Sequence, residues 1–177
     1  MISKKTYRQA QNVASDFFKK AGLVMSDAET KNIEVADFGL NDLWNTGLEL
    51  VTYVNTERVC AKEMVLAPGQ ACPEHLHPPI GDSAGKEETF RCRYGTVYLF
   101  VEGEPTENLS VNPPDGDYNV FHEIMLTPGL QYTIYPNTKH WFMAGTQGAV
   151  VSEFSTTSHD ENDIFTDSRI NRLPVIE

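Results

Sequence analysis

The sequence is poor in cysteine and contains no long apolar run. Only three of its 177 residues are cysteines, Cys60, Cys72 and Cys92, and no two of them have CxxC spacing. An odd number of thiols without such spacing predicts reduced cysteines in a cytoplasmic protein rather than a disulfide framework, with at least two of the three buried. No stretch approaches the roughly 18 apolar residues of a membrane-spanning helix. No apolar segment follows the N-terminal lysines, as a secretion signal would require.

Basic residues are also scarce. The chain has 14 Lys and Arg against 25 Asp and Glu, which gives a net charge of −11 at pH 7. Nucleic acids and anionic membranes bind cationic surfaces, so we expect neither as a partner. The hydrophobic content of 40% is ordinary for a globular protein, and the length of the chain fits a single domain, residues 1–177.

The first 47 residues have the pattern of helices. Apolar residues recur at helical spacing from Tyr7 to Ala21, and Gly22 then marks a helix end. Ser26 followed three residues later by Glu29 fits a capping box. We expect residues 1–47 to form a helical extension packed on the outside of a larger body.

From residue 48 the pattern becomes that of strands. Short runs rich in Val, Tyr, Phe, Thr and Ile alternate with Pro, Gly and Asn at the spacing of an antiparallel sandwich or barrel. We therefore predict an all-β barrel over residues 48–165, with residues 103–119 as a polar surface loop within it. Residues 166–177 carry no strong pattern and are expected to form a C-terminal tail.

Two histidines one residue apart are the first chemical feature. On a strand, His75 and His77 would face the same side, so their imidazoles could converge on one cation. Taken alone, the HxH pattern fits an exposed strand face better than a metal site.

Glu88 strengthens the metal interpretation. The strand that it opens places Glu88, Phe90, Cys92 and Tyr94 on one face, and three of these four are apolar or aromatic. We expect that face to point inward, where a carboxylate needs a partner such as a metal ion. Glu87 lies on the opposite face, which is predicted to be solvated.

His140 provides a fourth donor. It shares a mostly apolar strand face with Phe142 and Ala144, so it is predicted to point inward. Three imidazoles and one carboxylate suit a divalent transition metal and leave coordination positions open for substrate oxygens, whereas structural zinc sites are closed and rich in sulfur. His122 and His159 lack such support and are predicted not to be ligands.

These residues resemble the two motifs of the cupins, a family of small β-barrels. The first motif is Gly-x5-His-x-His-x(3 or 4)-Glu-x6-Gly, and ten residues separate the second His from Glu here. All its other intervals are kept by Gly69, His75, His77, Glu88 and Gly95.

The second cupin motif is Gly-x5-Pro-x-Gly-x2-His-x3-Asn. Its spacing is kept at Gly129, Tyr135, Asn137, His140 and Ala144, with Tyr, Asn and Ala in place of Pro, Gly and Asn. Asn is the residue best able to replace Gly at positive φ. The resemblance implies a jelly-roll β-barrel.

Within the cupins, residues 60–165 are similar to the D-lyxose isomerases, in particular the short bacterial kind. The resemblance is carried by "CPEHLHPPIGDSAGKEETFRCRYG", "PNTKHWFMAG" and "SEFST". It implies a homodimer that interconverts D-lyxose and D-xylulose, and also D-mannose and D-fructose. It further implies Mn²⁺ held by His75, His77, Glu88 and His140.

The same resemblance places Lys62, Glu153 and an aspartate in the active site. Asp163 is the favoured aspartate, although Asp160 and Asp167 lie in the same short segment. On this interpretation Glu153 is the base, Lys62 holds or protonates a substrate oxygen, and Asp163 serves in sugar binding or ring opening.

The residue chemistry is compatible with such a reaction. Aldose–ketose isomerisation needs a cation to polarise the carbonyl and stabilise an enediolate, together with a base beside C2. Glu153 lies in an alternating strand of buried type, and Lys62 shares a face with Cys60 and Met64. On the pattern alone, an edge-strand charge or a structural ion pair explains Lys62 and Glu153 equally well.

Two other functions use the same ligand set. An iron-dependent cupin dioxygenase would consume oxygen, but no feature points to its substrate. A non-catalytic sugar-binding cupin would show no turnover with metal present, but it would not need the additional candidate base. The sequence does not decide between sugars, or between proton transfer and hydride shift.

The ten-residue insertion between His77 and Glu88 is predicted to form a flap over the sugar site. We expect Lys86 and Asp82 to lie near the rim of this flap.

Overall fold

The computed structural model describes residues 2–173 and 175–177. Two helices precede the main sheet, α1 (Lys4–Lys20) and α2 (Asp27–Lys31), and Ser26 with Glu29 forms the predicted capping box. Neither helix in the described part of the chain is long and apolar enough to cross a membrane. The buried face of α1 consists of Ala10, Ala14, Phe17 and Phe18.

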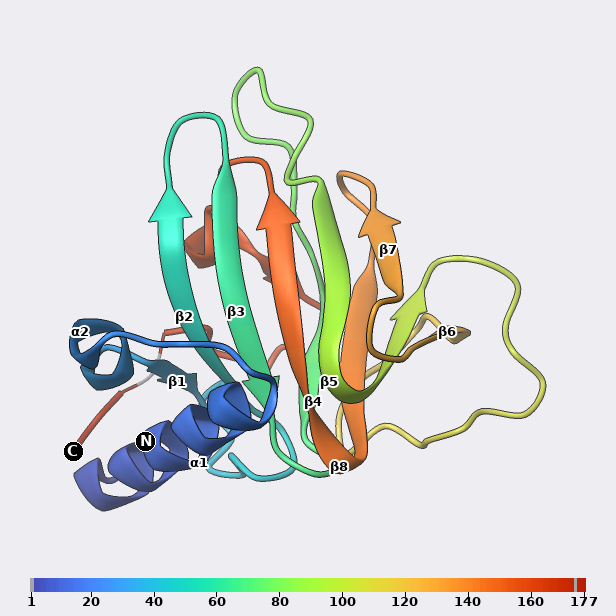
Figure 1. Ribbon diagram of the computed structural model, residues 1–177. Helices are drawn as coiled ribbons and strands as arrows, with labels where there is room; N and C mark the ends of the chain where they lie inside the picture. The colour runs from blue at the N-terminus through green and yellow to red at the C-terminus, as the bar shows by residue number, and fades with distance from the viewer. Residues whose placement is uncertain (1, 174) are drawn as a thin grey trace.

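In the described residues, nine strands make up a single curled sheet. They are β1 (Glu34–Ala36), β2 (Leu48–Asn55), β3 (Cys60–Leu66), β4 (Ala71–Leu76), β5 (Glu88–Val101), β6 (His122–Leu126), β7 (Gln131–Ile134), β8 (His140–Ser155) and β9 (Ile164–Phe165). Their order is β1-β2-β3-β8-β4-β9, and β5 pairs with β6, β7 and β8. The helices lie on one side of this body and the long loop between β5 and β6 on the other (Figure 1). The predicted all-β barrel with N-terminal helices is therefore confirmed.

β5 and β8 form the central ribbon of the barrel. They pair antiparallel along their whole length, from Glu88 opposite Ser155 to Val101 opposite His140. If straight, β5 would span about 43 Å at about 3.3 Å per residue, yet the side chains of Glu88 and His140 approach within 2.9 Å. The ribbon therefore coils until its two ends face each other across the barrel interior.

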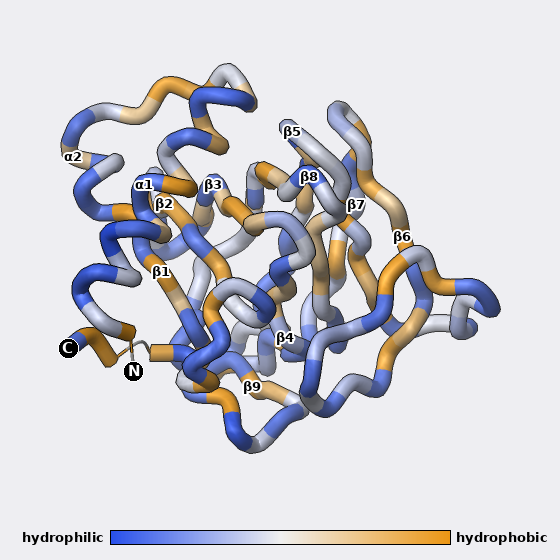
Figure 2. The backbone as a smooth tube through the Cα atoms, turned by 90° about the horizontal axis from the view of Figure 1, so that it is seen from below, coloured by the Kyte–Doolittle hydropathy of each residue, from blue (hydrophilic) through white to orange (hydrophobic). Residues whose placement is uncertain are grey.

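Apolar side chains pack on both faces of the sheet. Met64 and Val151 belong to the cluster inside the barrel, whereas their neighbours Val65 and Val150 pack outside, against Phe17 of α1. This alternation along β3 and β8 is the one expected of strands covered on both faces. Figure 2 shows α1 and α2 lying beside β1, β2 and β3, which form the covered wall.

Tyr94 does not share the inward face predicted for it. The register between β5 and β8 shifts between Cys92 and Tyr94, which is the signature of a β-bulge and reverses the alternation of side chains. Glu88, Phe90 and Cys92 are buried, as predicted. Tyr94 instead packs outside the barrel, with its ring centroid 6.0 Å from that of Phe17.

The two terminal segments are more closely integrated than the sequence indicates. The helical extension expected over residues 1–47 also contains β1, which pairs with β2, and Phe38, which joins the interior cluster. In the expected tail, Ile176 bridges to Ile2 and Ile170 packs on the interior cluster. Cys60, Cys72 and Cys92 are buried and free, as predicted.

Candidate active site

Three histidines meet inside the barrel. His75 lies on β4, His77 directly follows this strand, and His140 opens β8 opposite His75. One ring nitrogen of each histidine lies within 4.8 Å of the others, and all three side chains are buried. The strand geometry thus brings the three predicted imidazoles together.

The other ring nitrogen of each histidine, Nδ1, contacts an oxygen atom on the side away from the cluster. His75 Nδ1 lies 2.8 Å from the carbonyl oxygen of Pro73, and His140 Nδ1 lies 2.9 Å from that of Thr138. His77 Nδ1 lies 2.5 Å from Asp163 Oδ1. Because carbonyl and carboxylate oxygens accept the Nδ1 protons, each Nε2 is left to face the cluster, as is usual for imidazole ligands of metals.

Glu88 completes the donor set. Its Oε1 lies 2.9 Å from His140 Nε2 and 3.2 Å from His77 Nε2, whereas its Oε2 lies 2.7 Å from Lys86 Nζ. The short contact with His140 is not aligned as a hydrogen bond, and His140 Nε2 is a buried polar atom without a hydrogen-bond partner in the described residues.

These four side chains fit a divalent cation. An orphaned, buried Nε2 is costly unless something binds it. The separations of 3.2 and 2.9 Å from Glu88 Oε1 to the Nε2 atoms of His77 and His140 also match neighbouring ligands of a six-coordinate ion whose bonds are roughly 2.2 Å long. Burial lowers the pKa of His77, but Glu88 and Asp163 outweigh burial and raise it to about 9. A cation bound at Nε2 would take the place of the proton that His77 otherwise presents to Glu88, while the Nδ1 proton stays with Asp163.

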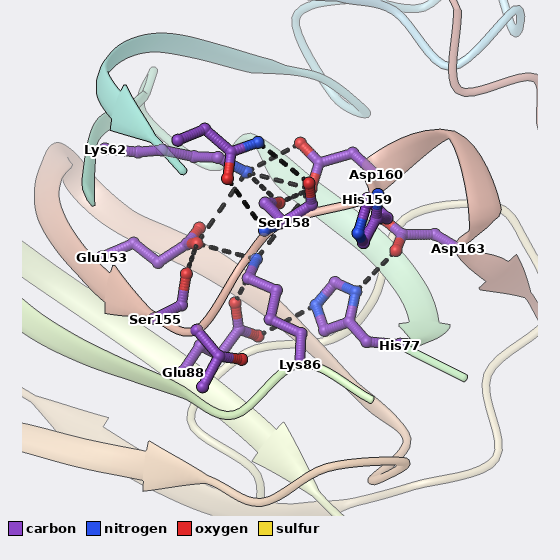
Figure 3. Close-up of polar contacts among 12 residues, drawn as sticks. Lys62, His77, Lys86, Glu88, Glu153, Ser155, Ser158, His159, Asp160 and Asp163 are labelled. Carbon is purple, nitrogen blue, oxygen red and sulfur yellow. Dashed lines mark hydrogen bonds and ion pairs between the residues drawn. The ribbon is translucent and has the colours of Figure 1, made fainter. Parts of the chain in front are cut away.

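A second group of charged residues adjoins the donors. Lys86 Nζ lies 2.7 Å from both Glu88 Oε2 and Glu153 Oε1, and so bridges the two carboxylates (Figure 3). Lys62 Nζ lies 3.8 Å from the same oxygen of Glu153, and Ser155 donates a hydrogen bond to it. All three of these contacts of Glu153 use Oε1.

Asp160 holds Lys62 from the other side. The carboxylate of Asp160 lies 2.7 Å from Lys62 Nζ, and Ser158 also accepts a hydrogen bond from this lysine. Arg172, from the C-terminal segment, contacts Asp160 at 3.3 Å and Glu34 of β1 at 2.6 Å. Positive and negative side chains therefore alternate along the row of contacts that leads from Glu34 and Arg172 to Glu88 and the histidines.

The buried charges stabilise one another. Burial opposes the charged form of Lys86, but Glu153, Glu88 and Asp160 raise its pKa well above the usual range. Burial likewise opposes the ionised form of Glu88, but Lys86 and His77 lower its pKa well below the usual value. The pKa of Asp160 is lowered in the same way, chiefly by Lys62. Lys86, Glu88 and Asp160 therefore each favour the charged form.

These groups line one cavity inside the barrel. His75, His77, Glu88, Lys86 and Glu153 form part of its wall. The remaining wall is largely apolar and includes Phe38, Leu48, Leu50, Met64 and Phe165.

The structure gathers the site residues that the sequence singles out. His75, His77, Glu88, Lys62, Glu153 and Asp163 all line this cavity. Glu87 is exposed, as predicted. Asp160 lines the cavity as well and is the aspartate that contacts Lys62, whereas Asp167 pairs with Arg169. His122 lies outside the cluster, with its Nδ1 at 3.0 Å from the carbonyl oxygen of Glu104.

The expected position of Lys86 at the rim of the flap is wrong. Its side chain is buried between Glu88 and Glu153, whereas Asp82 is exposed. The alternation that makes Glu88 inward and Glu87 outward also makes Lys86 inward when it is continued one residue further back. That signal was present in the sequence, but the Gly- and Ser-rich surroundings of Lys86 indicate only a loop.

Comparison with known proteins identifies the family. The D-lyxose isomerase family model matches residues 104–177. The chain is 60% identical to the D-lyxose/D-mannose isomerase of Thermosediminibacter oceani over 180 aligned residues, which cover 100% of this chain and 99% of the relative. It is 58% identical to the D-lyxose ketol-isomerase of Cohnella laeviribosi, over 97% of this chain and 96% of the relative. The chain belongs to the D-lyxose isomerase family.

The fold of this family member is shared with more distant isomerases. The L-ribose isomerase of Acinetobacter sp. DL28, solved with L-ribose, superposes with a TM-score of 0.77 at 16% identity, covering 99% and 98% of the two chains. The unliganded L-ribose isomerase of Cellulomonas parahominis gives a TM-score of 0.73 at 17% identity, covering 95% and 94%. The barrel is therefore cupin-like, and the protein is a sugar isomerase with a three-histidine site suited to a divalent metal.

Proposed function

We propose that the protein interconverts D-lyxose and D-xylulose, and also D-mannose and D-fructose, with a divalent metal, Mn²⁺ in the first place. The observation that carries this proposal is the position of Glu153, whose Oε1 contacts Lys86 and Ser155; Oε2 is the oxygen that we assign to the substrate. Glu153 lines the same cavity as His75, His77 and Glu88. The names of the relatives support the choice of sugars.

In this proposal His75, His77, His140 and Glu88 hold the metal, which supplies Lewis-acid polarisation of the sugar carbonyl when bound. Glu153 Oε2 takes the proton from C2, and the electron pair of the C2–H bond forms a C1–C2 double bond as the C1 carbonyl opens. The proton on O2 passes to O1 in the enediol stage. Glu153 then returns its proton to C1, and C2 becomes the ketose carbonyl.

Lys86 and Lys62 have distinct positions in this scheme. Lys86 lies between Glu88 and Glu153, so its ammonium group is placed beside the reacting carbons and stabilises negative charge that develops on the substrate oxygens. Lys62, which Asp160 and Ser158 hold in place, would bind a sugar hydroxyl. The role of Asp163 in sugar binding or ring opening stays a prediction, while its contact with His77 Nδ1 supports a role in orienting that ligand.

A panel of free aldoses, assayed on chelator-treated and then Mn²⁺-restored protein, tests the proposal. We expect turnover of D-lyxose that is lost on chelation and returns with the metal, and incorporation of solvent deuterium at C1 of the product. Turnover without deuterium at C1 would indicate a hydride shift instead of proton transfer. Oxygen consumption by iron-loaded protein without isomerisation would overturn the proposal, as would an inactive metal-loaded protein.

The homodimer and the cytoplasmic location expected from the resemblance and from the composition belong to the same proposal. Light scattering coupled to size-exclusion chromatography would measure the first, at a monomer mass of 19.8 kDa.

A further inference from the structure

Phe38 is the one cavity-lining residue of the described chain with a left-handed backbone, at φ 51°. Bulky residues rarely adopt such a conformation, and where they do, the conformation is often held for a functional reason. The Phe38 side chain is buried and belongs to the cluster inside the barrel. The sequence places this residue in an extension expected to pack only on the outside.

The surroundings of Phe38 fix its unusual backbone. Asp37 accepts a hydrogen bond from the backbone N–H of Gly39 at 3.1 Å, and Asn171 donates its backbone N–H to the carbonyl oxygen of Phe38 at 2.8 Å. A Cβ at Gly39, which has φ 75°, would lie 3.1 Å from Asn171 Cβ. The C-terminal segment therefore clamps the backbone that directs the Phe38 ring into the cavity.

A row of rings connects Phe38 to the proposed metal donors. The ring centroid of Phe165 lies 5.4 Å from that of His75, and the centroid of Phe38 lies 5.8 Å from that of Phe165. In the proposed reaction O1 and O2 are held near the histidines, and C1 and C2 lie beside Glu153. With Lys62 on a hydroxyl next to the reacting carbons, this arrangement assigns the far end of the sugar to the apolar part of the cavity, which includes Phe38 and Phe165.

We propose that Phe38 is a specificity-determining residue: together with Phe165 it forms the end wall that limits the length of the sugar chain. This inference rests on the proposed function and concerns the selectivity of the same site for D-lyxose over D-mannose. D-mannose has the configuration of D-lyxose at C2 to C4 and carries one more hydroxymethyl group. On this assignment the additional group lies against the Phe38 ring, which cannot form a hydrogen bond with its hydroxyl, so D-mannose is the slower of the two substrates.

The test compares Phe38→Ala with Phe38→Gly. Both variants remove the ring, but Gly also relieves the left-handed backbone, so the two should differ in thermal stability. We expect both to raise the ratio of kcat/KM for D-mannose to that for D-lyxose roughly tenfold, the scale of one carbon in a packed pocket. Phe38→Leu, which should shift the ratio less in the same direction, serves if the two smaller residues prevent folding.

Phe100→Ala is the matched control. Phe100 is equally buried, but it stacks on Trp141, with ring centroids 3.8 Å apart, and lies outside the cavity. Its loss should lower stability and leave the ratio unchanged. Calorimetric binding of the two unreactive alditols, D-mannitol and D-arabinitol, gives a second readout and should shift in the same sense.

The outcomes separate this inference from the proposed function. A wild-type protein inactive on both sugars overturns the proposed function. A wild-type protein active on D-lyxose, with a ratio and an alditol preference that stay within twofold in every Phe38 variant, overturns the inference alone.

Discussion

Two buried glutamates lie on opposite faces of the sheet, and their pKa values are shifted in opposite directions. Glu88, inside the barrel, contacts Lys86 and two histidines, and these keep its pKa well below the usual value. Glu49 of β2 faces the other way, between Leu48 and Leu50, both of which point into the barrel. Burial raises the pKa of Glu49 to about 8.

The difference lies in the partners, because both side chains are almost completely buried. Glu49 Oε1 has a hydrogen bond of 3.3 Å from the amide of Gln70, and Glu49 Oε2 is a buried atom without a hydrogen-bond partner among the described residues. Burial alone neutralises a carboxyl group, whereas burial beside cations preserves its charge. The charged form is therefore favoured for Glu88, which the proposed chemistry uses, and disfavoured for Glu49, which it does not use.

Replacing the proposed base should have the largest effect. Glu153→Gln keeps the shape of the side chain but removes its ability to accept a proton, so kcat should fall about 10²- to 10⁴-fold. Metal content, measured by elemental analysis, should stay at the wild-type level. Full turnover with metal still bound would remove Glu153 from the mechanism.

Removing the Lys86 ammonium group tests whether it keeps Glu88 ionised. Lys86→Met leaves two buried carboxylates without their shared partner, and we expect the free energy of unfolding to fall by about 3 kcal/mol or more, along with activity. Lys86→Arg should recover part of the stability because it retains the charge. Lys19→Met, at an exposed position, is the control and should change neither quantity in urea denaturation or in the assay.

Neutralising Glu49 tests the other face. Its folded-state pKa of about 8 exceeds its ordinary value of 4.5, so its contribution to stability is fully present below pH 4.5 and is lost as the pH rises toward 8. Glu49→Gln should therefore gain about 2–4 kcal/mol over wild type between pH 5 and pH 8. Urea denaturation at several pH values measures this difference.

Glu57→Gln at an exposed position is the control for the Glu49 experiment. A stability difference between Glu49→Gln and wild type that is the same at pH 5 and pH 8 would show that Glu49 is already ionised in the folded protein.

Asp163 should have the smallest effect of the four. Asp163→Asn weakens the acceptor behind His77 Nδ1 and should lower metal affinity about 10- to 100-fold, as loss of such a partner typically does. Competition with a chelator measures the affinity. Asp167→Asn, in the same segment but paired with Arg169, should leave metal affinity unchanged. Equal metal affinities of the two variants would show that Asp163 does not support His77 as a metal ligand.

Strand alternation was a reliable guide to the candidate site. It predicts the buried faces of Glu88, His140 and Glu153 because a strand has only two sides and each of these residues has apolar neighbours two positions away. It fails at Tyr94, because a bulge is set by pairing with a distant strand and leaves no local pattern.

Other features depend on long-range packing that the sequence does not express. Asp160 and Asp163 lie three residues apart, but a short 3₁₀-helix (Asp160–Asn162) separates their directions, so one contacts Lys62 and the other His77. Phe38 reaches the cavity because the C-terminal segment holds its backbone. No local propensity predicts either placement.

The coiled β5–β8 ribbon also bears on how the protein folds. Glu88 and His140 stand at opposite ends of that ribbon, so a cation bound by both would clasp it into a closed ring. No partly paired ribbon could present both ligands at once. Metal affinity should therefore appear only when the last turn of the barrel has formed, which would make the ion a reporter of completed folding as well as a participant in the proposed reaction.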